Sequence, residues 1–203
     1  ITAERVTLWN AEDEVPLRAL WVTNSTGLTL DSGTFNIIEG DAFAGEGLVS
    51  ELHPGERRLL SYAADTAMQV NSDEDESSMP YSRVVVAKGI MKLTREERSS
   101  TTYRVHNSDV QPREVIVEHP VTDGWELADG LKPEESSSSF HRFRIKVEPN
   151  KTTELKIGEF KPQETQYVVS NLTSDQVAMF VSEKAVDPSL EQNLRRVLAK
   201  KDE

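Results

Sequence analysis

The 203-residue sequence contains no cysteine, and this absence excludes several kinds of chemistry at once. Disulfides, thiol nucleophiles and cysteine-ligated zinc all require that residue. No apolar run approaches the roughly 18–20 residues that span a bilayer, so we expect no membrane insertion by this segment. Basic residues number 23 against 35 acidic ones, for a formal net charge of −12. Nucleic acids and anionic membranes attract clustered Lys and Arg, so we expect the chain to bind neither.

Sequence motifs of common catalytic and nucleotide-binding sites are missing as well. The chain has no HExxH, GxSxG, GxGxxG or P-loop pattern. The acidic run at residues 73–76 lacks the glycine and terminal glutamate spacing of a calcium loop, which favours a solvated loop. The serines at 136–139 are interpreted as a loop between strands. We therefore expect a non-enzymatic chain without a metal or cofactor.

Alternation of apolar and polar residues is the pattern that is present. In residues 142–148, Phe143, Ile145 and Val147 point to one side and the charged residues to the other. A period of two is typical of a half-buried β-strand. Similar segments predict strands at residues 5–9, 17–23, 28–30, 34–38, 57–62, 83–87, 90–93, 101–106, 114–119, 153–160 and 166–169.

Turn residues and polar runs suggest how these strands connect. Residues 31–33 predict a hairpin between 28–30 and 34–38, and residues 148–151 predict a second hairpin. Residues 95–100 are predicted to form a polar hairpin tip. Residues 71–78 contain no apolar side chain, which favours an exposed loop and an internal boundary.

The period changes to a helical one near the C-terminus. Thr173 and Gln176 fit a capping box before a helical face with Val177 and Phe180. Asp187 and Pro188 are typical of a helix start. The stripe Leu190, Leu194, Val197 and Leu198 either packs on the strands or associates with a second copy. The helix looks cut at residue 203, and the start at Ile1 without Met suggests a piece of a longer or processed protein.

These patterns predict an all-β, mostly antiparallel β-sandwich with a short C-terminal helical tail. We expect two sandwich-like halves, at residues 1–78 and 79–170, of which an immunoglobulin-like arrangement is one form. Residues 171–203 form the tail, which is expected to lead into a coiled coil of the parent protein. Whether the two halves form one domain or two stays open.

Three blocks of this sequence resemble the carboxy-terminal β-sandwich region of bacterial mucoidy inhibitor A-like proteins, a family of unknown function. The first block is residues 42–47 with 52–65, the second is residues 103–107 with 115–120, and the third is residues 140–145. The resemblance implies a β-sandwich paired with long coiled-coil segments. It implies a bacterial envelope or periplasmic setting rather than the cytoplasm, and it brings no reaction, cofactor or catalytic residue.

Histidine is the first candidate for chemistry. In a strand, His119 would point to the same side as Val115 and Val117, and His141 would point to the same side as Phe143 and Ile145. If the two strands are neighbours, the imidazoles form a metal or acid–base pair, and the alternative function is a metal-dependent hydrolase. Buried imidazoles are more often hydrogen-bonded core residues, which favours a structural role.

Trp125 is the second candidate, because it follows a turn at Asp123-Gly124. An exposed indole at that place is typical of a carbohydrate-binding module, whereas a packed one is structural. The function that the sequence favours is a non-catalytic structural or protein-interaction module of a larger bacterial protein. Its expected partner is another protein, or a second copy bound through the C-terminal helix.

Overall fold

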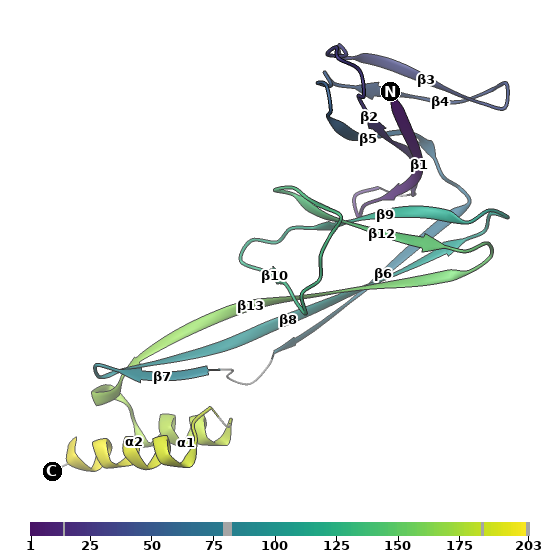
Figure 1. Cartoon of the computed structure of the whole chain (residues 1–203). Coiled ribbons are helices and arrows are strands. Elements are labelled where there is room, and N and C mark those ends of the chain that lie inside the picture. The colour runs from purple at the N-terminus through teal and green to yellow at the C-terminus, as the bar shows by residue number, and fades with distance from the viewer. Residues whose placement is uncertain (14, 79–82, 184, 202–203) are drawn as a thin grey trace. The chain divides into compact units, whose positions relative to one another are not determined.

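The computed structural model describes residues 1–13, 15–78, 83–183 and 185–201. Strands make up 57% of the chain, and two α-helices follow them, so the mostly β fold with a helical tail is confirmed. The strands are β1 (Thr2–Trp9), β2 (Leu17–Thr23), β3 (Gly33–Glu39), β4 (Ala42–Val49), β5 (Arg57–Ala64), β6 (Met68–Ser78), β7 (Arg83–Ala87), β8 (Ile90–Asn107), β9 (Arg113–Pro120), β10 (Glu126–Leu127), β11 (Glu135–Ser136), β12 (Phe140–Val147) and β13 (Thr152–Val168). The helices are the short 3-10 helix η1 (Val169–Asn171), α1 (Ser174–Ser182) and α2 (Pro188–Lys201) (Figure 1).

The strands form three sheets, which run antiparallel except at one pair. The largest sheet has the order β11-β12-β9-β1-β2-β5, and β1 pairs with β9 in parallel. A second sheet has the order β10-β13-β8-β6, with β7 also paired to β8. The third sheet is the hairpin of β3 and β4 alone. The predicted alternation of β12 is confirmed, since Phe143 and Val147 are buried and Ile145 is half-buried.

The chain divides into two compact units. Unit 1 comprises residues 1–73, 102–122 and 132–156, and unit 2 comprises residues 74–101, 123–131 and 157–203. The strands β6, β8 and β13 each contribute residues to both units. The boundary predicted between residues 78 and 79 adjoins residues 79–82, which lie outside the described residues.

Two segments predicted as loops are strands. Residues 71–78 belong to β6, although residues 71–77 are all exposed as expected. Residues 95–100 lie in the middle of β8 rather than at a hairpin tip. Both errors have the same cause. A strand with polar side chains on both faces has no hydrophobic period, and its backbone pairing leaves no trace in the sequence.

Two predicted hairpins are wrong as well. β3 pairs with β4, across a turn in which Gly40 and Asp41 have positive φ, and not with residues 28–30. Residues 148–151 do turn the chain, with Asn150 at φ 53°, but the strands on either side enter different sheets. Turn residues therefore located the reversals, while the pairing partners were set by packing between distant segments.

The same arrangement of strands and hydrogen bonds occurs twice in unit 1. The Asn24 side-chain amide donates to the Leu28 and Leu52 carbonyls, and its backbone N–H donates to the Glu56 carbonyl. The Asn107 amide donates in the same way to Gln111 and Val147, and its N–H donates to Lys151. Both asparagines are fully buried at the end of a strand. We call the segment from Asn24 into β5 the first half-repeat and the segment from Asn107 into β13 the second half-repeat.

Each half-repeat contains a hairpin and ends in a turn that includes a proline. Pro54-Gly55 and Pro149-Asn150 lead into β5 and β13, respectively. The hairpin is β3–β4 in the first half-repeat and β9–β12 in the second. Asn107 follows Asn24 by 83 residues (107 − 24), and Arg113 follows Leu30 by the same spacing. Leu30 and Arg113 form the first residue pair of their hairpins, with Leu52 and Val147, respectively.

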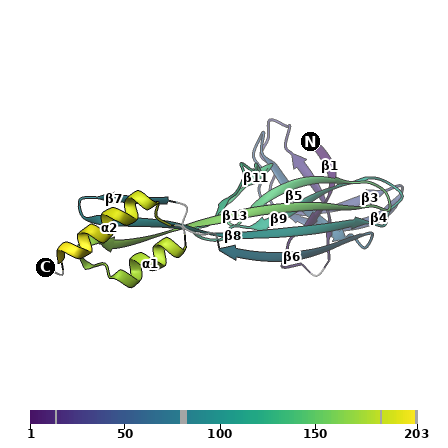
Figure 2. The ribbon, with the colours of Figure 1, turned by 90° about the horizontal axis from the view of Figure 1, so that it is seen from below.

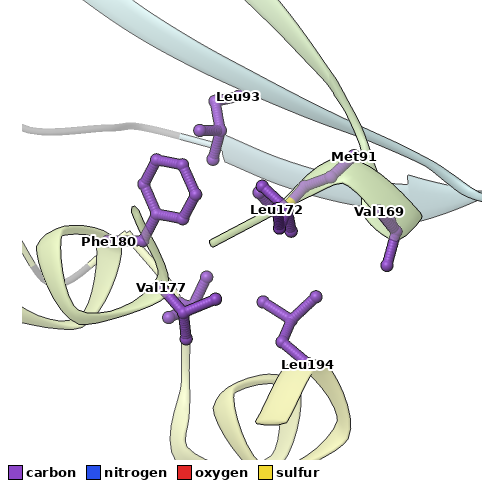
Figure 3. Packing of buried hydrophobic residues seen from close by; sticks show 8 residues of the cluster. Met91, Leu93, Val169, Leu172, Val177, Phe180 and Leu194 are labelled. Atoms are coloured by element: carbon purple, nitrogen blue, oxygen red, sulfur yellow. The ribbon is translucent and has the colours of Figure 1, made fainter. Parts of the chain in front are cut away.

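Unit 2 has its own apolar core between strands and helices. Thr173 and Gln176 form the predicted capping box, and the Asp187 carboxylate accepts from the Leu190 N–H at the start of α2. Figure 2 shows both helices lying along the β7–β8 end of the sheet. The buried cluster, drawn in Figure 3, consists of Met91, Leu93, Val169, Leu172, Val177, Phe180, Val186 and Leu194.

Most of the C-terminal stripe is used in this core. Leu194 is buried, and Leu190 and Leu198 pack against the cluster, whereas Val197 is 40% exposed. Of the two alternatives for the stripe, packing on the strands is the one observed. Among the described residues, no helix is long and apolar enough to cross a membrane.

A buried carboxylate connects four elements of unit 1. Asp65, which follows β5, is fully buried. Its Oδ2 accepts from the Thr7 hydroxyl of β1 at 2.7 Å, and its Oδ1 lies 3.8 Å from Arg18 Nε of β2 and 4.0 Å from Arg113 Nη2 of β9. Its backbone N–H donates to the Pro16 carbonyl. One side chain thus joins β1, β2, β9 and the turn after β5.

Replacing Asp65 by Ala is expected to destabilise the chain by about 3–5 kcal/mol. The change removes the negative charge between two guanidinium groups and leaves the Thr7 hydroxyl without its acceptor. Urea unfolding followed by circular dichroism measures the difference. Asp31→Ala, at an exposed position of the same unit, is the matched control and should stay within about 0.5 kcal/mol of wild type. Equal midpoints for both variants would contradict the assignment.

Candidate functional site

The two candidate histidines are direct neighbours across paired strands. His141 of β12 lies opposite His119 of β9 in the antiparallel register, so both side chains lie on one face of the sheet. His119 is 3% exposed, and its Nδ1 is hydrogen-bonded to the Tyr103 hydroxyl at 2.6 Å. His141 is half-buried, and its Nδ1 is hydrogen-bonded to the Ser136 hydroxyl at 2.8 Å.

Aromatic rings surround His119. The Tyr103 ring meets the imidazole edge-to-face at a centroid distance of 5.8 Å, and Trp9 meets Tyr103 at 5.3 Å. These contacts place His119 in a packed layer between the strands of two sheets. Among the described residues, no group of three or more His, Cys, Asp or Glu side chains is placed to hold a metal ion. The hydrolase alternative stays a prediction.

Trp125 lies in unit 2 at the rim of a hollow of about 340 Å³. Its side chain is half-buried. Glu76, Glu97, Arg98 and Ser77 line the same hollow. An indole beside carboxylates and a hydroxyl suits a ligand that has both an apolar face and hydrogen-bond donors. Trp125 is the single aromatic residue among the described residues of that lining, and the carbohydrate alternative stays a prediction.

Trp21 lies on one face of the six-stranded sheet. Trp21 is 3% exposed and packs with Val6, Ala19 and Ile116. The Arg57 guanidinium lies 4.0 Å from the centre of the Trp21 ring. Cations at this distance over an indole are attracted to its π-face. Side chains of the protein itself therefore occupy this face.

A ring of four charges covers the same face. Glu4 contacts Arg57 at 3.4 Å and Arg144 at 2.6 Å, while Glu134 contacts Arg57 at 3.2 Å and Arg144 at 2.7 Å. Arg57 is on the edge strand β5, and Glu134 adjoins β11 at the opposite edge. Two edges of a flat six-stranded sheet would be separated by about 24 Å. The charge ring thus requires strong curvature of the sheet.

Three exposed large apolar side chains of unit 1 lie on the hairpin of β3 and β4. We call this hairpin the ribbon (Figure 1). Its outer face consists of the side chains of Thr34, Asn36, Ile38, Phe43, Glu46 and Leu48. Ile38 and Phe43 are each 64% exposed and lie opposite one another, and Leu48 is 76% exposed. On this face, an apolar pair, the polar pair Asn36–Glu46 and apolar Leu48 follow one another.

The inner face of the ribbon is fixed to β5 by close backbone contact. A Cβ atom at Gly45 would lie 2.4 Å from the Tyr62 carbonyl oxygen, and one at Gly47 would lie 2.5 Å from the Ser61 carbonyl oxygen. Only glycine fits at that distance. Glu39 accepts a hydrogen bond from the Tyr62 hydroxyl and pairs with Arg5. Burial and this bond to Glu39 raise the pKa of Tyr62.

Sequence reasoning did not single out the ribbon as a site. Ile37 and Ile38 are adjacent and apolar, so the alternation does not show which of them is exposed. Ile38 lies on the outer face with Thr34 and Asn36, while the register shift lies in β4, where the extra residue Ala44 brings Phe43 to the same face as Glu46 and Leu48. The one available signal was the glycine pair at 45 and 47, which indicates close backbone approach.

Comparison with known proteins adds no relative. No family model, curated protein or solved structure matches this chain. The resemblance to mucoidy inhibitor A-like proteins therefore stays a prediction.

Glu134→Gln is expected to lower stability at pH 7 but to have little effect at pH 3. Hydrogen bonds from Arg144 lower the pKa of Glu134 in the folded protein. A carboxylate with a lowered folded pKa stabilises the fold above its unfolded pKa of about 4.3, and that contribution is lost as the pH falls through the folded pKa. Melting temperatures at both pH values measure the effect. Glu46→Gln, at an exposed site of the same unit, should show no such pH dependence.

Proposed function

We propose that this chain is a non-catalytic structural and protein-interaction module of a larger bacterial protein. The observation that supports the proposal is the outer face of the ribbon. Three large apolar side chains, Ile38, Phe43 and Leu48, are each more than 60% exposed there on a two-stranded sheet. Exposed apolar patches bordered by polar residues are typical of interaction sites.

The way the ribbon is anchored also favours a binding role. Gly45 and Gly47 hold its inner face against the β5 backbone, so the outer face is presented on a fixed support. A rigid surface binds a partner at a lower entropic cost than a mobile loop. The family resemblance adds an envelope or periplasmic setting and a coiled coil beyond α2 as parts of the same proposal. Self-association through α2 is a variant of it, in which the exposed Val197 takes part.

The immunoglobulin-like sandwich is part of this proposal for unit 1. It is supported by the contacts of Tyr103 on β8 with Trp9 on β1 and His119 on β9, which join strands of two sheets. Face-to-face packing of two sheets through interdigitated side chains is the defining feature of a sandwich. The parallel pairing of β1 with β9 distinguishes this arrangement from one that is antiparallel throughout.

Photo-crosslinking in cells that make the protein tests the interaction. A crosslinking amino acid at Phe43 is expected to give discrete adducts with another protein, and Ile38→Ser is expected to remove them. Ile38 is the cross-strand partner of Phe43 and is 64% exposed, so the variant should melt close to wild type.

The same crosslinker at Val110 is the matched control. Val110 is 76% exposed, as Leu48 is, but lies alone in a loop after β8. Adducts of equal yield and pattern from positions 43 and 110 would show unspecific contact and contradict the proposal.

Saccharide binding at Trp125 is a second candidate, supported by the hollow that this indole borders. Its two carboxylates, Glu76 and Glu97, favour an amino sugar over an acidic one. Calorimetric titration with a glucosamine oligomer is expected to show binding that Trp125→Ala abolishes. Phe43→Ser, which removes an exposed aromatic side chain elsewhere, should leave this binding unchanged. Equal heats for wild type and Trp125→Ala would exclude the site.

A further inference from the structure

The two half-repeats differ in how their hairpins are flanked. In the second half-repeat, β9 lies between β12 and β1, and Thr7, Leu8 and Trp9 pair in parallel with Val115, Ile116 and Val117. In the first half-repeat, β3 pairs with β4 on one side. Within the described residues, no strand pairs with its other edge. The 83-residue spacing places residues 32–34 of that edge at the positions equivalent to Val115–Val117.

The equivalent side chains also differ in exposure. The pair Val117–Phe143 corresponds to Thr34–Leu48. Val117 and Phe143 are 0% and 6% exposed, whereas Leu48 is 76% exposed. In the second half-repeat, the hairpin β9–β12 has β1 as a neighbouring strand, and the face with Val117 and Phe143 is buried. In the first half-repeat, the hairpin β3–β4 has no such neighbour among the described residues, and Leu48 on the equivalent face is exposed. An unpaired edge beside exposed apolar side chains is the usual site of strand addition.

Charge indicates what kind of strand would fit. Residues 19–56 contain no Lys or Arg, and they contain the six acidic residues Asp31, Glu39, Asp41, Glu46, Glu51 and Glu56. Glu39 is paired with Arg5 inside the unit. Glu46 lies in the middle of the outer face, between Leu48 and the Ile38–Phe43 pair. Along β4, the outer face therefore carries apolar Leu48, acidic Glu46 and apolar Phe43 in sequence, with three residues rather than two from Glu46 to Phe43 because of the register shift.

We infer that the free edge of β3 binds an extended segment of another polypeptide by strand addition, with apolar, basic and apolar side chains at alternate positions. A strand added at this edge lies directly beside Thr34, Asn36 and Ile38 of β3. One of its apolar side chains then contacts Ile38, and its long basic side chain extends across Asn36 toward Glu46 of β4. The main chain of the segment satisfies the N–H and C=O groups along the β3 edge. This inference rests on the proposed function and names the chemistry of the partner.

The probe is a synthetic peptide in which Leu, Lys and Val alternate with Thr, flanked by Ser. Titration of the 15N-labelled full chain is expected to shift the amide signals of residues 33–39 and to leave those of Gly124 and of the α1 helix unchanged. A peptide with Glu in place of Lys should bind about tenfold more weakly, because like charges then face each other. In the chain variant Glu46→Lys, this preference should reverse.

Backbone N-methylation of the peptide separates strand addition from simple apolar contact. N-methyl groups at alternate residues remove donors from the peptide without changing the protein, and they should abolish the shifts along β3. Unchanged affinity of the methylated peptide, or an unchanged preference in Glu46→Lys, would overturn the inference. If the ribbon still crosslinks through position 43 while the peptide gives no β3 shifts, the inference fails and the proposed function stands. If position 43 behaves like position 110, the proposed function itself fails.

Discussion

The strongest constraint on how the strands of unit 1 meet is the burial of the Asp65 carboxylate, which accepts from Thr7 and lies near Arg18 and Arg113. A carboxylate removed from water is stable only when cations and donors surround it. Here they come from three separate strands, so the strands have to be in their native register before the charge is compensated. The contact therefore favours the observed order, in which β1 lies between β9 of the second half-repeat and β2 of the first.

Charge has a second role on the face of the sheet that carries Trp21. The guanidinium of Arg57 lies over the indole, and the ring formed with Glu4, Arg144 and Glu134 joins residues from both edges of the sheet. This face is thereby filled by the protein itself. The ribbon and the hollow at Trp125, by contrast, carry exposed or half-buried side chains. Acidic residues lie at both places, Glu46 on the ribbon and Glu76 and Glu97 at the hollow, in keeping with the net charge of −12.

Sequence reasoning was reliable where one face of an element is buried and local chemistry is strong. The alternation around Phe143 and the capping box at Thr173 predicted β12 and α1 correctly. It failed where pairing is made by the backbone alone. β6 has polar side chains throughout residues 71–78, and β4 begins with small residues and glycines, so neither shows a period. The neighbouring positions of His119 and His141 were anticipated, whereas the ribbon was not, because the outward position of Phe43 depends on a register shift in β4.

The two buried asparagines have a consequence for how far a substitution acts. Asn24 and Asn107 each satisfy the carbonyls at the base of their own hairpin, so each copy closes without help from the other. A change on the outer face of β3–β4 therefore leaves the hydrogen bonds that close β9–β12 in place. One hairpin can vary its surface while the other keeps its interior packing.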